Sequence, residues 1–280
     1  MSADEPPVLS AQAMGEDDDS ERYIDSSIPN VARIYDYLLG GKENYAADRE
    51  VAQNLITLVP DAAAAAHHNR QFLQRAVRFL AGEAGIRQFI DIGTGLPTQG
   101  NVHQIAQQFQ PDAHVLYVDH DPVVVAHARA LLADSETVVA IKGDLRDPDG
   151  ILSHPVLRDH IDLDEPVAVL LIAILHFIED SENPHGIVRR LAGAMPAGSY
   201  LALSHITADE VPLEMSDKAR QLYARATASA VPRSRTVIER FFTGLTMIDP
   251  GLVSVSAWRP EPASTVPART IFYAGVGKKG

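Results

Sequence analysis

The sequence of 280 residues contains no cysteine. This absence excludes disulfides, thiolate catalysis and cysteine-based zinc sites, and it predicts a protein of the reducing cytoplasm. Long apolar runs are also missing, because no stretch approaches the roughly 20 apolar residues that a membrane-spanning helix needs. The acidic N-terminus lacks the basic and then apolar segments of a secretory signal. We therefore expect no contact with a membrane.

Positive charge is scarce as well. Lys and Arg number 24 against 37 Asp and Glu, which gives a formal net charge of -13. Residues 1–25 hold eight acids against Arg22 alone, so they carry -7 and leave -6 for the rest of the chain. Segment 1–27 is therefore expected to be an acidic disordered tail, with solubility favoured over partner binding as its role. The remainder lacks the basic surface of a phosphate-backbone binder, so no nucleic-acid partner is expected.

Strand and helix patterns alternate through the middle of the chain. Apolar runs predict five strands, at 87–92, 114–119, 137–142, 167–174 and 199–206, and helical spacing predicts helices at about 98–109, 122–132 and 184–195. This alternation predicts a Rossmann-like α/β fold, in which a mostly parallel sheet carries helices on both faces.

Other helical patterns lie outside this alternation. They precede the sheet at 29–58, with a break at Gly40-Gly41, and at 68–80; they follow it from Met215 to Ala226 and at 234–242, before strands near 252–258 and 270–276. We expect one domain over 28–280, made of N-terminal helices (28–82), a nucleoside-binding core (83–206), a helical insertion (207–245) and C-terminal strands (246–280). The extra N-terminal and late helices are expected to form a lid.

The first strand of the alternation runs into a glycine turn, with Gly93, Thr94 and Gly95 directly after it, and the second strand ends on Asp119. Two glycines let the backbone turn sharply and approach a ligand at the carboxyl edge of the sheet. A carboxylate at the next strand end can accept two hydrogen bonds from a ribose, each of about 1.5–3 kcal/mol. The pattern predicts a nucleoside site, with a loop-capping role for Asp119 as the alternative.

The turn argues against a dinucleotide. A Gly-x-Gly-x-x-Gly fingerprint starting at Gly93 needs glycine at 98, where Thr98 stands, and Pro97 removes a backbone donor from the loop. S-adenosylmethionine, which carries a ribose and an adenine but no phosphate, is the favoured ligand. Asp144 and Leu145, after the third strand, are candidates to contact the amine and the face of the adenine. A plain turn at Asp144 explains the same residues.

The motifs resemble those of class I S-adenosylmethionine-dependent methyltransferases, from about residue 88 to 206. Asp91-x-Gly93-x-Gly95 is similar to their first motif, Asp119 to their ribose-binding acid, Asp144-Leu145 to their adenine pair, and residues 174–178 (ILHFI) to the segment beside the transferred methyl. Thr94 and His120 join these as candidate cofactor-binding residues. Pro97 departs from the class, in which many members carry a third glycine there.

A narrower resemblance covers nearly the whole chain after residue 25. Residues 34–44 (IYDYLLGGKEN), 91–98 (DIGTGLPT) and 241–245 (FFTGL) resemble the S-adenosyl methyltransferase family, formerly filed as a domain of unknown function. The resemblance implies a seven-stranded sheet whose last strand is antiparallel, and it lends no substrate. It also makes Tyr35 and Tyr37 candidates to cover the methionine moiety, with core packing as the alternative.

Methyl transfer from a sulfonium is an in-line displacement, so alignment can supply most of the catalysis. A hydroxyl or amine acceptor gains from a general base, and His176 and His205 are the candidates, with a structural role as the alternative for each. The scattered histidines lack convergent metal spacing, so no metal is expected. The leading hypothesis is a methyltransferase that acts on a small-molecule acceptor and releases S-adenosylhomocysteine. A NAD-dependent oxidoreductase and a non-catalytic, cofactor-binding regulatory protein are the alternatives.

Overall fold

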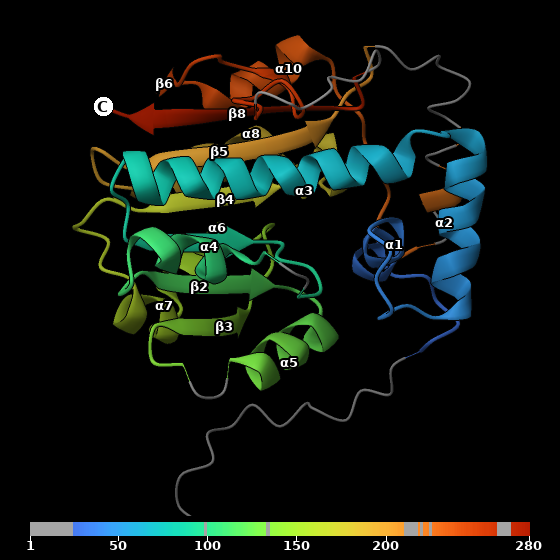
Figure 1. The fold of residues 1–280 in the computed structure, drawn as a ribbon, viewed down its shortest axis with the longest axis horizontal. Coiled ribbons are helices and arrows are strands. Elements are labelled where there is room, and N and C mark those ends of the chain that lie inside the picture. Colours follow the sequence, from blue (N-terminus) through green and yellow to red (C-terminus); the bar gives the residue numbers. More distant parts are fainter. Residues whose placement is uncertain are drawn as a thin grey trace, which may run out of the picture.

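The computed structural model describes residues 25–97, 100–132, 135–209, 218, 221–223, 226–261 and 270–280. Within these ranges the chain forms one mixed sheet of eight strands in the order β3-β2-β1-β4-β5-β8-β6, with β7 paired to β8 (Figure 1). The strands are β1 (Gln88–Ile92), β2 (His114–Asp119), β3 (Val138–Lys142), β4 (Ala168–Ile172), β5 (Tyr200–Ile206), β6 (Leu245–Met247), β7 (Val253–Ser254) and β8 (Phe272–Lys279).

Strands β1 to β5 run parallel, and β8 joins β5 antiparallel, from the pair Tyr200–Lys278 to the pair Ile206–Phe272. The predicted Rossmann-like sheet with an antiparallel last strand is confirmed. The strand expected at 252–258 is limited to β7, and β6 lies where the helical insertion was expected to end. Both strands hold only two or three residues, too few for an alternating apolar pattern to develop.

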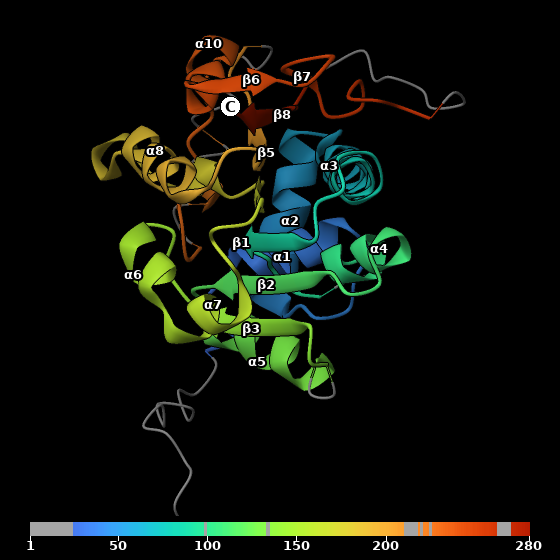
Figure 2. The ribbon, with the colours of Figure 1, turned by 90° about the vertical axis from the view of Figure 1, so that its left-hand side faces the viewer.

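Helices cover both faces of the sheet (Figure 2). On one face lie α3 (Ala62–Arg78), which continues into the π-helical turn η1 (Phe79–Glu83), α4 (Val102–Phe109) and α5 (Pro122–Leu131); on the other lie α6 (Pro148–Ser153), α7 (Pro155–His160), α8 (Pro184–Ala194) and α10 (Arg235–Glu239), followed by the 3-10 turn η4 (Arg240–Phe242). Successive side chains of a strand point to opposite faces, so Phe89 and Ile90 of β1 enter two different hydrophobic cores.

One helix prediction needed correction, two helices were missed, and one predicted helix cannot be compared. The helix expected at 98–109 begins at Val102, where Asn101 and Gln104 form a capping box, and Thr98 lies outside the described residues. No element was predicted for residues 143–166, yet α6 and α7 form there. Each has six residues and begins at a proline, so it is too short to show helical periodicity. The amphipathic helix expected from Met215 to Ala226 falls mostly outside the described residues.

Helices α1 (Val31–Leu38) and α2 (Ala46–Leu58) lie beyond the carboxyl ends of the parallel strands (Figure 1). The chain leaves α1 at Gly40, whose φ of 76° is left-handed, so the predicted break at the glycine pair is confirmed. Ile34, Val51 and Leu55 pack the two helices together in a third hydrophobic cluster. None of the helices that the structure describes combines the length and apolar composition needed to span a bilayer.

Candidate functional site

A cavity of about 210 Å³ lies at the carboxyl edge of the parallel strands. It sits where the strand order reverses, since β1 pairs with β2 on one side and with β4 on the other. Crevices of this kind are where open α/β sheets bind ligands. The loops after β1 and β2 line one end with polar groups, whereas α1, α2, α3 and the start of β8 supply mainly apolar walls.

Asp119 ends β2 at the polar end of this cavity. Its Oδ2 accepts a hydrogen bond from the backbone N–H of Gly95 at 3.0 Å, and its Oδ1 accepts one from the backbone N–H of Asp121 at 3.0 Å. These bonds use one lone pair of each oxygen, so further lone pairs can accept hydroxyl groups of a ligand. The imidazole of His120 lies 3.4 Å from Oδ1, and this contact raises the pKa of His120.

The glycine turn lies against this carboxylate. Gly93 and Gly95 have φ values of 76° and 64°, in the left-handed region that glycine enters without strain. A Cβ at Gly93 would collide with the side chain of Ile174, whereas a Cβ at Gly95 would meet no atom within 4 Å. The turn therefore combines tight packing at its start with open space at its ligand-facing end.

Asp91 and Thr94 form a second polar pair at this end. The Thr94 hydroxyl donates to Asp91 Oδ2 at 2.8 Å, and both residues line the cavity. Burial raises the pKa of Asp91 to about 6, with Thr94 opposing the shift. Ionisation of this buried carboxyl group costs free energy in the protein alone. A cationic or hydrogen-bonding ligand beside it lowers that cost.

Tyr35 reaches the cavity from α1. Its hydroxyl donates to the carbonyl oxygen of Ala66 at 3.1 Å and accepts from Asn69 Nδ2 at 2.9 Å. Tyr37 does not line the cavity; its hydroxyl accepts a hydrogen bond from Gln53 of α2 at 3.2 Å. The two tyrosines predicted together thus point to different surroundings, because neighbours two positions apart on a helix lie on different faces.

Asp144 and Leu145 do not line this cavity. The carboxylate of Asp144 is 41% exposed and forms a bidentate contact with Arg146 Nε at 2.9 and 3.0 Å. It lies close enough to His120 to raise the pKa of that imidazole, so it borders the polar end of the cavity from outside. Leu145 is buried with Ile151 in the hydrophobic core under α6, α7 and α8.

His176 lies on the cavity wall in the 3-10 turn η2 (Leu175–Phe177) after β4. Its side chain is buried, and its Nδ1 has no hydrogen-bond partner among the described residues. Burial, followed by the charges of His205 and Arg233, lowers the pKa of His176 well below its usual value. The ring is therefore neutral at physiological pH.

His205 is fully buried and does not line the cavity. Its Nδ1 lies 2.7 Å from the carbonyl oxygen of Ile206 and its Nε2 lies 2.9 Å from Arg233 NH1. A carbonyl only accepts and a guanidinium only donates, so the proton resides on Nδ1 and the Nε2 lone pair is occupied. Burial lowers the pKa of His205 to about 3. Both ring nitrogens are thus engaged in structural hydrogen bonds.

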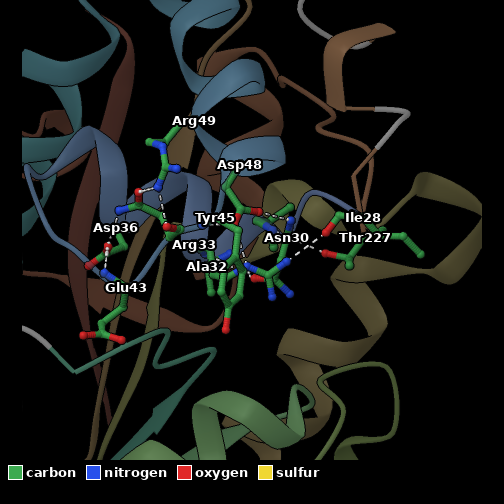
Figure 3. Close-up of polar contacts among 12 residues, drawn as sticks. Ile28, Asn30, Ala32, Arg33, Asp36, Glu43, Tyr45, Asp48, Arg49 and Thr227 are labelled. Carbon is green, nitrogen blue, oxygen red and sulfur yellow. Dashed lines mark hydrogen bonds and ion pairs between the residues drawn. The ribbon is translucent and has the colours of Figure 1, made fainter. Parts of the chain in front are cut away.

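The N-terminal helices are fastened to the core beside this site. Asp48 of α2 is fully buried and accepts hydrogen bonds from the backbone N–H groups of Asn30 and Tyr45 and from Arg33 Nε, at 2.7 to 2.8 Å (Figure 3). Asn30 in turn donates through Nδ2 to Asp121 Oδ2 at 2.5 Å. This chain of contacts joins α1 and α2 to the loop that carries Asp119.

Several cavity residues were absent from the sequence-based site. The main ones are Asn69 on α3 and Tyr223, whereas Phe177 belongs to the segment 174–178 that the resemblance placed beside the transferred methyl. Asn69 alone carried a readable signal, because it stands on the apolar stripe of α3, three residues before Phe72 and four after Ala65. A polar residue on such a stripe marks a buried polar group.

Comparisons with known proteins identify the family to which the chain is similar. The model of the S-adenosyl methyltransferase family matches residues 17–280. A DUF574 family protein from Streptomyces avermitilis MA-4680 is 41% identical, with 92% of this chain and 100% of that chain covered and a TM-score of 0.88. A Thermobifida fusca YX protein described as a candidate methyltransferase is 39% identical, with 91% and 96% covered and a TM-score of 0.85. No curated protein matches the chain.

A more distant structure supports the fold alone. An O-methyltransferase family protein from Burkholderia thailandensis is 16% identical and has a TM-score of 0.52, with 80% of this chain and 62% of that chain covered. The family model, by contrast, extends over nearly the entire sequence, and it confirms the resemblance inferred from the glycine turn and its flanking motifs. This chain belongs to the S-adenosyl methyltransferase family.

Proposed function

We propose that this protein transfers the methyl group of S-adenosylmethionine to a small-molecule acceptor. The observation that carries the proposal is the carboxylate of Asp119, which lies on the cavity wall and is fixed by the backbone N–H of Gly95. A carboxylate beside a glycine turn at this edge of the sheet is suited to a ribose with two free hydroxyls. When bound, S-adenosylmethionine supplies an electrophilic methyl group on a sulfonium.

The residues at the polar end fit this cofactor. Asp119 accepts the two ribose hydroxyls through the lone pairs that Gly95 and Asp121 leave available. The backbone of the glycine turn lies along the amino-acid end, next to the Asp91–Thr94 pair. The raised pKa of Asp91 suits this place, because a cationic ammonium nearby favours the ionised carboxylate. His120 and Asp144 border the adenine, and Leu145 packs in the hydrophobic core beneath these two residues.

His176 is the general-base candidate that the geometry favours. Its neutral ring on the cavity wall has an unpartnered nitrogen, which can accept the proton of a hydroxyl or amine as the methyl group is transferred. His205 is assigned a structural role, because its only lone pair already accepts from Arg233. The catalytic proposal therefore narrows from two histidines to one.

Helices α1 and α2 act as a lid in this proposal. They contact the core through the hydrogen bond from Asn30 to Asp121, two residues beyond the ribose-binding acid, and through the bonds of Tyr35 to α3. The Asp48 cluster keeps α1 and α2 together, so they move as one body when the cavity opens (Figure 3). Such a lid excludes water from the sulfonium and admits the cofactor only when open.

Isothermal titration calorimetry with S-adenosylmethionine and S-adenosylhomocysteine tests the proposal. We expect saturable binding by the folded protein and roughly 10- to 100-fold weaker binding by Asp119→Asn, since a bond to a charged group contributes about 1.5–3 kcal/mol. Asp112→Asn, on an exposed turn before β2, is the matched control and should bind like the parent. Absence of binding by the folded parent, or equal binding by Asp119→Asn, would refute the proposal.

A further inference from the structure

The part of the cavity away from the glycine turn and Asp119 is lined mainly by apolar side chains. Its walls come mainly from Leu55, Ala62, Ala66, Phe177, Ala230 and Phe272. The carboxylate of Asp36 also borders the cavity, but its Oδ2 already accepts from Glu43 N and Asn44 Nδ2, each at 2.9 Å. Because most of this lining is apolar, an acceptor bound here loses the hydration of its body, so that body must itself be largely apolar. We call this apolar part of the cavity the acceptor chamber.

One polar side chain in the wall of this chamber has an unused oxygen. Asn69 on α3 is 1% exposed, and its Oδ1 has no hydrogen-bond partner among the described residues. The orientation of its carboxamide follows from its neighbours. The hydroxyl of Tyr35 donates its single proton to the Ala66 carbonyl, so the atom of Asn69 that touches this hydroxyl must be the donor, Nδ2. The remaining atom, Oδ1, is an acceptor.

The surroundings of this oxygen favour a neutral donor over a cation. Arg70 follows Asn69 in α3, and its positive charge is close enough to the Tyr35 hydroxyl to lower the pKa of Tyr35, against the larger, opposite effect of burial. An ammonium group placed beside Asn69 would meet this like charge. A hydroxyl or a neutral N–H would not.

We propose that Asn69 determines acceptor specificity: its Oδ1 accepts a hydrogen bond from a neutral O–H or N–H group on an otherwise apolar acceptor, such as a phenol or an indole. This inference rests on the proposed function, because a molecule in the chamber is a methyl acceptor only if the cofactor occupies the other end of the cavity. The donor group of such a molecule is also the kind of atom that receives a methyl group, and His176 lies on the same cavity wall.

Two isosteric probes test the chamber. We choose 2-naphthol and 2-methylnaphthalene, which differ by a hydroxyl in place of a methyl, and measure their dissociation constants by ligand-observed NMR with saturating S-adenosylhomocysteine and also without it. The variants are Asn69→Leu and, as a matched control, Gln71→Leu, which also replaces a carboxamide side chain by leucine, at an exposed position of α3. Thermal unfolding of each variant verifies that it is folded.

The parent and Gln71→Leu should bind 2-naphthol roughly three- to tenfold more tightly than 2-methylnaphthalene, as expected for one net hydrogen bond. Asn69→Leu should lose this preference and retain its affinity for S-adenosylmethionine. An unchanged preference in folded Asn69→Leu, or no binding of either probe by the parent, would overturn the inference. Weaker S-adenosylmethionine binding by Asn69→Leu would overturn it too, by assigning Oδ1 to the cofactor's ammonium. Failure of the parent to bind cofactor would refute the proposed function, while the probe preference of the free protein still tests the chamber.

Discussion

Arg233 offers the sharpest test of how the 3-10 turn that carries His176 is held in place. Its guanidinium is 4% exposed and donates to the carbonyl oxygens of Leu175 at 3.0 Å and Ile178 at 2.7 Å, which flank His176 on either side. It also donates to His205 Nε2 at 2.9 Å and to Asp180 Oδ1 at 2.7 Å. One side chain thus fixes the 3-10 turn that carries His176 to strand β5.

The expected cost of Arg233→Met follows from these contacts. Two buried acceptors, the Ile178 carbonyl and His205 Nε2, lose the donor that Arg233 supplies, at about 1–3 kcal/mol each. The Leu175 carbonyl keeps the backbone N–H of Ile178 at 3.2 Å and loses one further hydrogen bond, at about 0.5–1.5 kcal/mol. The carboxylate of Asp180 adds little, because its side chain is 80% exposed and returns to water. Removal of a buried charge recovers part of its desolvation penalty, so we take the low end for each group. The variant should lose about 2–3 kcal/mol of unfolding free energy.

Urea denaturation followed by circular dichroism measures this loss. Arg189→Met, at an exposed position of α8, is the matched control and should change stability by no more than about 0.5 kcal/mol. NMR provides a second reading: the charge of Arg233 helps to hold the pKa of His205 at about 3, so that pKa should rise in Arg233→Met. A loss below about 1 kcal/mol, or an unmoved His205 pKa, would refute the assignment.

Three further predictions concern the site and its lid. The folded-state pKa of Asp91 is raised from 3.8 to about 6, so ionisation of Asp91 lowers the stability of the parent as pH rises through this window. The stability of Asp91→Asn relative to the parent should therefore increase by up to about 3 kcal/mol between pH 4 and pH 7 in urea titrations, and a difference that does not change with pH would contradict the shift. Asp48→Asn leaves the buried Arg33 charge uncompensated and should cost about 3–5 kcal/mol, seen as faster hydrogen exchange in residues 28–58; unchanged exchange there argues against the cluster as a fastening. Gly93→Ala should lower the melting temperature more than Gly95→Ala, because only the former meets Ile174 in addition to its positive φ, and equal melting temperatures would count against that packing.

The polar end of the cavity could be predicted as a cluster because its residues lie at the ends of consecutive strands. Gly93 and Gly95 follow β1 and Asp119 ends β2, and parallel neighbours bring their carboxyl ends to one edge. The backbone conformation there depends on glycine, and the positions of the glycines are read directly from the sequence. The parallel sheet follows from the same alternation, and the structure confirms it where the strands are long.

Side-chain direction was the part that the sequence left open. His205 shares a face of β5 with Leu201 and Leu203, two positions apart each, and those leucines belong to the core under α8 and η4. The sequence shows that these three residues lie on one face of the strand. Which of the two sheet faces borders the cavity depends on the packing of separate helices. The same limit applies to Leu145, whose turn directs it into that core.

The acceptor chamber depends on the fold in a way that the polar end of the cavity does not. Its walls come from α1, α2 and α3 before the first strand, from η2 in the middle, and from Ala230 and Phe272 near the end of the chain. No local motif links these segments, so their meeting is a property of tertiary packing alone. Substitutions in the chamber can therefore leave the glycine turn and Asp119 undisturbed. Under the proposed function, this separation places the information about the acceptor in residues such as Asn69 rather than in the motifs.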